Sequence, residues 1–515
     1  MSFYSILYPD QLRYKKPRRT TSPECLRDLN MDQLFSHILK NRADYQLEQF
    51  YHTQLQDKES IVYRQQVFQD LENVTIREMV SEYSRNAGLL RKRMDEIRSK
   101  LEKKEAWENN YLTRGYMLRE ADLYCNSVMD LSRKLQSISL KSVGMKAFKT
   151  YLGEYCTSET FLKFQECVEQ IKQKCKEISY CIYLKDGTVR VRKYQGEKSQ
   201  TDRILSLFEK FRQDTVKDYR HELNKAPYAE HIEAEILSML SEVYPDLFDK
   251  LADFCKSYIH FDDEILLLFA KEIQFYLGWL EMTAALQLSG LQFCYPEIDI
   301  DKRQMSAEAF FDVALAYLQS EHIVTNDFSL STPEHIMVVT GPNQGGKTTF
   351  ARAFGQLHYL ASLGVSVPGR CAKLLLCDQV LTHFEREEDI TNLNGKLQDE
   401  LERLHNLEQN ATSDSIIIIN EIFASTTLED AIKLGRYMME WLTLIGTPAV
   451  VVTFLDELAE YGPNTVSFMS MVDQNQEHSR SYKVIRKKPD GHAYALDIAE
   501  KYGLTYEQLE KRLQV

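Results

Sequence analysis

The pattern of apolar and polar positions divides the chain into a long helical part and a shorter part in which strands and helices alternate. From residue 31 to 175 the sequence has no proline, and Leu, Glu, Lys and Arg recur at helical spacing. Within 89–110, Leu90, Met94, Ile97 and Leu101 form a stripe with steps of four, three and four residues. This stripe predicts a helix with one buried face. It favours a helix packed in a bundle, with a long lever arm as the alternative.

A short β element interrupts the helical part. Apolar and polar residues alternate over 178–195 on both sides of Asp186-Gly187, a dipeptide that favours a tight hairpin turn. The hairpin carries four cations, Lys185, Arg190, Arg192 and Lys193. They are either phosphate contacts for a nucleic acid or the solvated surface of an ordinary turn. Residues 200–290 return to a helical pattern.

The pattern changes again near residue 295. Four continuous apolar runs, at 336–340, 373–377, 415–420 and 449–453, suit strands of a sheet buried on both faces, with helices between them. We therefore expect an α/β domain at 296–515, a mostly helical region at 31–295 and an irregular segment at 1–30. That first segment has three prolines and a basic cluster, which is either a phosphate contact or a solvated tail. The cluster comprises Arg13, Lys15, Lys16, Arg18 and Arg19.

Composition adds limits on these expectations. A chain of 515 residues suggests about two to four domains. The net charge of −13 argues against a wholly basic nucleic-acid coat, although local basic patches remain compatible with DNA binding. No apolar run is long enough to span a membrane, and the first residues lack the core of a signal peptide. The ten cysteines form no C-x-x-C pair, so we expect reduced thiols and a cytoplasmic protein.

The strongest chemical signal is the stretch VVTGPNQGGKTTF at 338–350. It fits the phosphate-loop pattern G-x-x-x-x-G-K-[ST] and lies between an expected strand and an expected helix. Backbone amides and the helix N-terminus would hold phosphate oxygens, Lys347 would neutralise phosphate charge, and the Thr348 hydroxyl would ligate Mg²⁺. The predicted nucleotide-binding residues are Gly341, Pro342, Asn343, Gln344, Gly345, Gly346, Lys347, Thr348 and Thr349.

A second motif ends the apolar run SIIIIN at 415–420. In ATPases of this kind an Asp at the end of such a strand orders Mg²⁺, and the Glu after it acts on the attacking water. Here the pair is Asn420-Glu421. Asn420 can accept a hydrogen bond but carries no charge, so we expect weaker Mg²⁺ ordering and slow turnover. A protein that binds nucleotide without hydrolysing it is the alternative.

These motifs resemble the MutS family of DNA mismatch-repair ATPases. The stretch TGPNQGGKTTFAR at 340–352 resembles the family's loop, and Ile323 to Asp327 resembles its segment beside the adenine, which implies nucleotide contacts for Ile323 and Asn326. LASLGVSVPG (360–369), NEIFASTT (420–427), TFLDELA (453–459) and KPDGHAYALDIAEKYGL (488–504) follow in the family's order. The resemblance implies an ABC-type α/β P-loop ATPase domain, preceded by a mostly α-helical core and lever region with a small β insertion. The C-terminal helical segment would serve dimerisation.

Several departures indicate a divergent branch. No counterpart of the family's N-terminal mismatch-reading domain is found, and Phe164-Gln165-Glu166, which matches its tripeptide, lies in a helical pattern. Phe454 stands where the family has a histidine that senses the γ-phosphate, and Ile323 replaces an aromatic residue. Lys396 lies where a Ser or Thr would act on the partner subunit's nucleotide; it is either such a group or a surface lysine. His383, within THFEREED (382–389), is expected to be a packed histidine rather than a catalyst.

The resemblance implies a homodimer with composite ATP sites that closes around DNA. The function we expect is an ATP-gated clamp in mismatch repair or recombination, with ATP and Mg²⁺ as cofactors. Lys347 and Glu421 would be catalytic, and Thr348, Asn420 and Glu421 would hold the metal. Double-stranded or branched DNA would be the partner, without a membrane, and the protein would then associate with the nucleoid. The alternative function is a nucleotide-dependent switch acting on a ribosome or another protein, with weak or no turnover.

Overall fold

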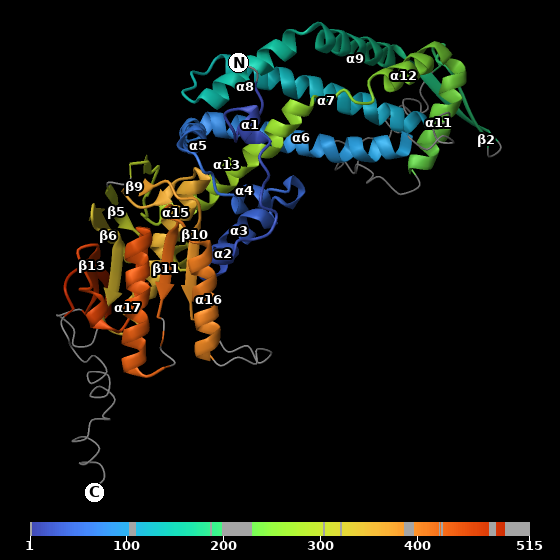
Figure 1. The fold of residues 1–515 in the computed structure, drawn as a ribbon. Helices are drawn as coiled ribbons and strands as arrows, with labels where there is room; N and C mark the ends of the chain where they lie inside the picture. The colour runs from blue at the N-terminus through green and yellow to red at the C-terminus, as the bar shows by residue number, and fades with distance from the viewer. Residues whose placement is uncertain are drawn as a thin grey trace, which may run out of the picture. The chain divides into compact units, whose positions relative to one another are not determined.

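The chain divides into two compact units (Figure 1). The structure, a computed structural model, describes residues 3–101, 110–185, 188–197, 229–301, 304–319, 322–385, 396–421, 423, 426–472 and 480–489. Unit 1 comprises Met1–Arg77, Leu140–Lys146 and Lys271–Val515, and unit 2 comprises Glu78–Ser139 and Ala147–Ala270. The division expected from the sequence, into 1–30, 31–295 and 296–515, follows chain order. The two units instead group the N-terminal segment with the C-terminal part.

Unit 2 is mainly helical, as its sequence pattern predicts. It contains most of α6 (Val74–Leu101) and α8 (Val143–Thr157), the whole of α7 (Tyr111–Gln136), α9 (Glu159–Glu177), α11 (Ala229–Val243) and α12 (Pro245–Ser257), and the start of α13 (Glu264–Leu288). The predicted stripe on α6 is buried, which confirms the core-facing interpretation. The rings of Tyr124, Phe164 and Phe261 contact one another in the unit's core. Among the described residues, no helix has both the length and the hydrophobicity needed to cross a membrane.

The predicted hairpin is present in unit 2. Strands β1 (Tyr180–Lys185) and β2 (Thr188–Lys193) pair antiparallel, with Tyr180 opposite Lys193. Its turn, Asp186-Gly187, lies outside the described residues. Arg190, Arg192 and Lys193 are exposed, so their charges are accessible to solvent.

The main sheet of unit 1 has the order β10-β11-β12-β7-β13-β14 within the described residues. Its strands are β7 (Ile336–Thr340), β10 (Val380–Phe384), β11 (Ile416–Asn420), β12 (Ala449–Val452), β13 (Thr465–Val472) and β14 (Arg480–Arg486). All pairs are parallel except the last, so the loops after the first five strands lie at one edge. The predicted strands at 336–340, 415–420 and 449–453 are confirmed as β7, β11 and β12. Their full burial matches their unbroken apolar sequence.

The fourth predicted strand, 373–377, is present, but the prediction that it belongs to the main sheet is wrong. Its counterpart β9 (Cys371–Leu375) belongs to a separate sheet with the order β4-β9-β5-β6. That sheet contains β4 (Glu297–Asp299), β5 (Gln304–Phe310) and β6 (Asn326–Ser331). The outer neighbour of β11 in the main sheet is β10, whose sequence VLTHF is interrupted by two polar residues. Those residues weaken its apolar signal, although His383 is buried in the structure.

Residues 3–71, called the N-terminal segment from here on, are part of the core of unit 1 and include the stretch 1–30 that was expected to be irregular. They form α1 (Gln11–Tyr14), α2 (Glu24–Asp28), α3 (Met31–Lys40), α4 (Glu48–His52) and α5 (Lys58–Leu71). The Leu29 side chain is fully buried, and its carbonyl accepts a hydrogen bond from Gln356 on α15 (Lys347–Leu363). In the basic cluster, Arg13 pairs with Asp57 and Glu59, and Arg18 stacks on the Phe50 ring. Those two arginines are therefore structural, whereas Lys15, Lys16 and Arg19 are exposed.

Glu272 on α13 anchors the first residues of this segment. Its Oε2 accepts hydrogen bonds from the Ser5 hydroxyl at 2.7 Å and from the Ile6 amide at 3.0 Å. Its Oε1 is buried and has no hydrogen-bond partner among the described residues. Burial raises the pKa of Glu272 to about 7, against the smaller lowering effect of its two hydrogen bonds. The carboxyl group therefore takes up a proton on folding in mildly acidic solution.

This raised pKa predicts a pH-dependent stability. Between the unfolded value, about 4.3, and the folded value, about 7, the folded protein binds more protons, so its unfolding free energy falls as pH rises. Glu272→Gln removes the titration and keeps an acceptor for Ser5 and Ile6. We expect the variant to gain about 2 to 3 kcal/mol relative to the wild type between pH 5 and pH 8. Urea unfolding of both proteins at four pH values measures this difference, and a difference that stays constant with pH would contradict it.

Candidate nucleotide-binding site

The predicted phosphate loop joins the end of β7 to the start of α15. Gly341 has φ +115°, Gln344 has φ +59° and Gly346 has φ +91°, so the loop turns through left-handed backbone at three positions. A Cβ atom on Gly346 would lie 3.0 Å from the Tyr482 carbonyl oxygen of β14. Glycine is therefore required at Gly346 both by its backbone angle and by the approach of a second strand.

Strand β13 supports the same loop from another side. A Cβ atom on Gly345 would lie 2.3 Å from the Ser470 hydroxyl oxygen, which leaves no room for a side chain. Ser470 is fully buried, and its hydroxyl has no hydrogen-bond partner among the described residues. The β13–β14 hairpin thus contacts both glycines that precede Lys347.

Lys347 is buried in its own loop. Its ammonium donates to the carbonyl oxygens of Gly341 at 2.9 Å and Pro342 at 3.1 Å. The same ammonium lies 4.4 Å from the centroid of the Phe454 ring, a cation–π contact. Phe454, for which the sequence resemblance predicts the position of the family's histidine, is 49% exposed. The lysine charge is therefore stabilised by backbone dipoles and an aromatic face within this chain.

Asn420 and Glu421 lie at the same edge of the sheet as the loop. Strand β12 separates β11 from β7, and the three parallel strands end together: Glu421 N donates to Val452 O, and Thr453 N donates to Val339 O. Two buried oxygens at this edge, Thr340 Oγ1 and Asn420 Oδ1, have no hydrogen-bond partner among the described residues. Unpartnered buried acceptors of this kind fit a hydrated ion or a bound ligand.

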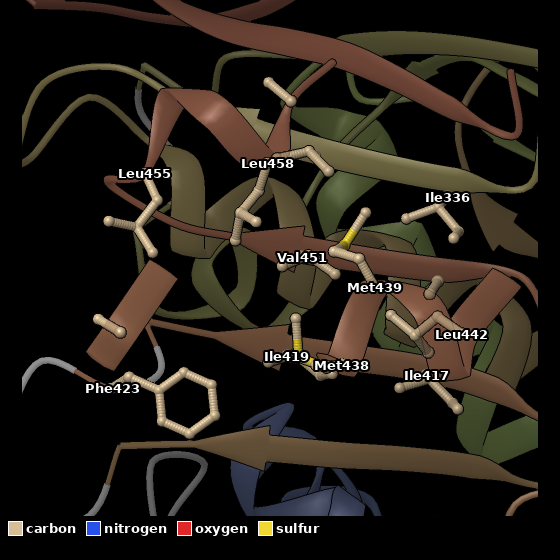
Figure 2. Close-up of a cluster of buried hydrophobic side chains, with 14 of the residues drawn as sticks. Ile336, Ile417, Ile419, Phe423, Met438, Met439, Leu442, Val451, Leu455 and Leu458 are labelled. Atoms are coloured by element: carbon tan, nitrogen blue, oxygen red, sulfur yellow. The ribbon is translucent and has the colours of Figure 1, made fainter. Parts of the chain in front are cut away.

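The backbone after β11 is strained. Glu421 has φ +54° and Phe423 has φ +59°, values that residues with a side chain rarely adopt. The Phe423 ring is buried in an apolar cluster with Leu407, Met438 and Leu455, and Figure 2 shows it at one end of that cluster. The Phe423 amide donates to Glu400 Oε1 at 2.7 Å. The loop that carries Glu421 is thus fixed through the residue two positions later.

Glu400 lies on α16 (Lys396–Asn410), beside His383 of β10. His383 Nε2 is 3.9 Å from Glu400 Oε1, and Arg403 Nη2 is 3.4 Å from His383 Nδ1. Burial lowers the pKa of His383, although Glu400 partly opposes the effect. The interpretation of His383 as a packed histidine with polar partners agrees with this geometry. The Lys396 side chain and residues 386–395 lie outside the described residues, so its predicted role stays a prediction.

The segment expected beside the base reaches the loop through β14. Asn326 is buried, and its Oδ1 accepts from the Val484 amide at 2.8 Å, while Lys483 Nζ donates to Thr325 O. Val484 is two residues from Tyr482, whose backbone contacts Gly346. Asn326 therefore has a clear structural partner, and Ile323 is partly exposed.

Sequence reasoning missed four contributors to this site: Ser470, Tyr482, Glu400 and the strand β10. None lies in a phosphate-binding motif. The partial alternation of polar and apolar residues in TVSFMSMV (465–472) was the available signal for β13. Glu400 had no local signal, because only the fold brings α16 to the loop after β11.

Comparison with known proteins identifies the C-terminal part. The MutS domain V family matches residues 337–513. The DNA mismatch repair protein MutS of Clostridium kluyveri is 26% identical over 233 residues, which cover 43% of this chain and 26% of that protein. The MutS protein of Carboxydothermus hydrogenoformans is 28% identical over 203 residues, or 38% of this chain and 24% of that protein.

These matches cover about a quarter of the length of each relative. The region that matches the family, 337–513, contains the phosphate loop, the Asn420-Glu421 pair and the β13–β14 hairpin. The C-terminal part of the chain, residues 337–513, therefore matches domain V of the MutS family.

Proposed function

We propose that this protein binds and hydrolyses ATP through a P-loop ATPase domain of the ABC type, and that it acts as a dimeric, ATP-gated DNA clamp. The observation that carries the ATPase proposal is one edge of a parallel sheet. The Lys347 loop follows β7 there, and Asn420 ends β11 with Glu421 directly after it, while β12 lies between the two strands. Ligands of open α/β sheets bind at this carboxyl edge.

The residues present fit ATP with Mg²⁺. The first turn of α15 offers backbone amides and a partial positive charge to phosphate oxygens. The partly exposed Thr348 would hold the metal or its water ligands together with Glu421 and with Asn420 Oδ1, which has no hydrogen-bond partner in the described part of the chain. When bound, Mg²⁺ would neutralise charge on the phosphate oxygens. Asn326 and Ile323 would lie on the base side of the site.

Hydrolysis assigns separate roles to the chain's own residues. The Lys347 ammonium would leave the carbonyls of Gly341 and Pro342 and donate to the γ-phosphate. The loop amides would hold the γ-phosphate in line with the attacking water. The Glu421 carboxylate would accept a proton from that water as its oxygen bonds to the γ-phosphorus. The bond from the γ-phosphorus to the bridging oxygen breaks, and ADP and phosphate leave. Asn420 supplies no charge, so we expect slow turnover.

The DNA-clamp proposal draws support from the family and from the surface of unit 2. The relatives are DNA mismatch repair proteins. Arg190, Arg192 and Lys193 are exposed on one hairpin strand and suit contacts to a phosphate backbone. A homodimer with composite ATP sites would couple nucleotide state to the grip on double-stranded or branched DNA. The dimerisation segment expected at the C-terminus lies outside the described residues. We propose a cytoplasmic, nucleoid-associated protein.

The net charge of −13 favours a second candidate, a nucleotide-dependent switch that acts on a ribosome or another protein. This candidate requires the same nucleotide site but no affinity for naked DNA. The DNA-binding experiment below separates the two functions.

The catalytic assignment predicts distinct effects for two substitutions. Glu421→Gln removes the proton acceptor, so we expect ATP turnover to fall about 100-fold or more, with ATP affinity retained. Lys347→Ala removes a charged donor, so we expect nucleotide affinity to fall about 10-fold to 100-fold. Phosphate release and binding of a fluorescent ADP measure these effects. Glu429→Ala, on the exposed surface of α17 (Leu428–Ile445), is the control. Equal turnover in wild type and Glu421→Gln would refute the assignment.

The neutral side chain of Asn420 predicts a gain on replacement by a carboxylate. Asn420→Asp restores a negative charge next to the metal position, and hydrogen bonds to charged acceptors are stronger than to neutral ones. We expect the Mg²⁺ concentration for half-maximal turnover to fall about fivefold. A Mg²⁺ titration of phosphate release at saturating ATP gives this value, and an unchanged midpoint would exclude Asn420 from the metal position.

The clamp proposal predicts salt-dependent DNA binding that involves the hairpin. Replacing Arg190 and Arg192 with Ala removes two potential phosphate contacts, so the slope of log affinity against log salt should fall by about 2. Gel shifts with a duplex, a mismatched duplex and a four-way junction measure it, with and without ATP. The control is the double variant Arg133→Ala, Lys163→Ala, which removes two exposed cations from α7 and α9. No binding at low salt would favour the switch that acts on a ribosome or protein.

A further inference from the structure

We infer that Glu400 is a positioning residue that holds the Glu421 loop in its strained conformation through the Phe423 amide. The inference rests on the proposed role of Glu421 in ATP hydrolysis. Glu400 belongs to a different element, α16, and lies 21 positions before Glu421 in the chain. None of the motifs that identify the nucleotide site includes it.

The strain of the loop is the first step of the argument. Glu421 and Phe423 both have positive φ angles, at +54° and +59°. A residue with a Cβ, and above all a bulky one such as Phe423, is held in this region only when its surroundings fix it there. A relaxed backbone would turn the Glu421 side chain to a different direction. Something must therefore stabilise the loop in the conformation that the structure has.

The second step concerns the contacts that fix the loop. Glu421 N donates to Val452 O of the neighbouring strand, which holds the near end. The Phe423 ring, 4% exposed, is buried among apolar side chains of α16 and α17 (Figure 2). The Phe423 amide donates to Glu400 Oε1 at 2.7 Å, which holds the far end. Two backbone amides therefore fix the loop: that of Glu421 donates to a backbone carbonyl, and that of Phe423 donates to the Glu400 carboxylate.

The third step concerns Glu400 itself, which has fixed neighbours from two elements. Its side chain is 14% exposed and faces His383 of β10, which is 2% exposed. Arg403 of the same helix donates to Phe384 O and lies beside His383, so α16 is attached to the end of β10. Burial by itself would raise the pKa of Glu400, but His383, the Phe423 amide and Arg403 together lower it. An ionised carboxylate makes a stronger acceptor for the amide than a neutral group would.

These contacts explain why a partly buried carboxylate faces a backbone amide next to the proposed catalytic residue. A misplacement of about 1 Å at a reacting group can reduce the rate about 100-fold. Glu400 does not touch the reacting atoms and acts only through the loop. Its loss should therefore reduce turnover while leaving the affinity for nucleotide, which depends on the Lys347 loop, unchanged.

The experiment compares substitutions at Glu400 that change either the length or the charge of the side chain. Glu400→Gln keeps an oxygen at the same distance but loses the charge, whereas Glu400→Asp keeps the charge and is shorter by one methylene group. Both retain a polar side chain at the partly buried position, and Glu400→Ala removes the acceptor. The matched control is Glu408→Ala, on the solvent-facing side of the same helix. The measurements are kcat and KM for ATP, affinity for a fluorescent ADP, and hydrogen–deuterium exchange of the peptide 415–427.

We expect kcat to fall about 10-fold or more in Glu400→Asp and Glu400→Ala. KM and ADP affinity should stay within about twofold, because the phosphate loop is untouched. Glu400→Gln should retain kcat within about threefold, since its amide oxygen still accepts. Exchange at peptide 415–427 should rise in the Asp and Ala variants only. Glu408→Ala should match the wild type in every measurement.

Three results would overturn the inference: unchanged kcat in Glu400→Asp, a parallel loss of nucleotide affinity, or unchanged exchange in the loop. If Glu400→Ala does not fold, the comparison of Gln with Asp decides by itself. Failure of the proposed function gives a different result, namely no turnover in the wild type beyond that of Glu421→Gln. In that case both the proposed ATPase function and the positioning role in hydrolysis are overturned. The hydrogen–deuterium exchange of peptide 415–427 then tests only the contact between Glu400 and the Phe423 amide.

Discussion

The arrangement of unit 1 depends on the burial of α15, the helix that begins at Lys347. Of its 17 residues, 14 are buried, including His358 and Gln356. Such a helix must be covered on every side. The main sheet covers one side, the rings of Phe310 and Phe328 from the second sheet cover another, and the N-terminal segment closes the rest. Tyr359 donates to Tyr51 O, and Ser362 O accepts from the Leu55 amide.

This enclosure links the nucleotide loop to distant parts of the chain. Arg352 and Gln356, one and two turns into α15, contact the backbone of Asp28 and Leu29. Asp28 also accepts from Thr382 of β10, the strand that carries His383 and receives the contact from Arg403. The phosphate loop, the loop after β11 and the N-terminal segment are therefore joined by consecutive polar contacts. Lys347 is the first residue of α15, and later residues of the same helix bind the N-terminal segment. A movement of Lys347 would therefore move the helix that holds that segment.

Elements that depend on neighbouring residues in the sequence could be predicted, whereas elements that depend on contacts between distant segments could not. The strands β7, β11 and β12 are unbroken aliphatic runs, and their buried positions require that composition. The phosphate loop is set by glycine angles and by its place between a strand and a helix, both of which are local. By contrast, β10 has two polar residues, and its burial depends on contacts from α2 and α16. The roles of Glu400, Ser470 and Tyr482 arise only when segments far apart in sequence meet.

The role of the basic residues in the N-terminal segment could not be read from charge alone. Arg18 is stacked on three aromatic rings, and Arg13 is paired with acidic residues of α5 and its N-cap. Their partners become visible only in the fold. The other three cations of the cluster, Lys15, Lys16 and Arg19, are exposed, which agrees with the interpretation as a solvated surface.

The burial of the first residues has a consequence for how the protein folds during synthesis. Ser5 pairs with Glu272, 267 positions later, and Leu29 contacts Gln356, 327 positions later. At typical translation rates, the segment leaves the ribosome on the order of tens of seconds before these partners do. During this interval Ser5 and Leu29 lack the hydrogen-bond partners that hold them in the finished fold. The nucleotide site likewise becomes complete only after β13 and β14, the last strands of the described sheet, have been made.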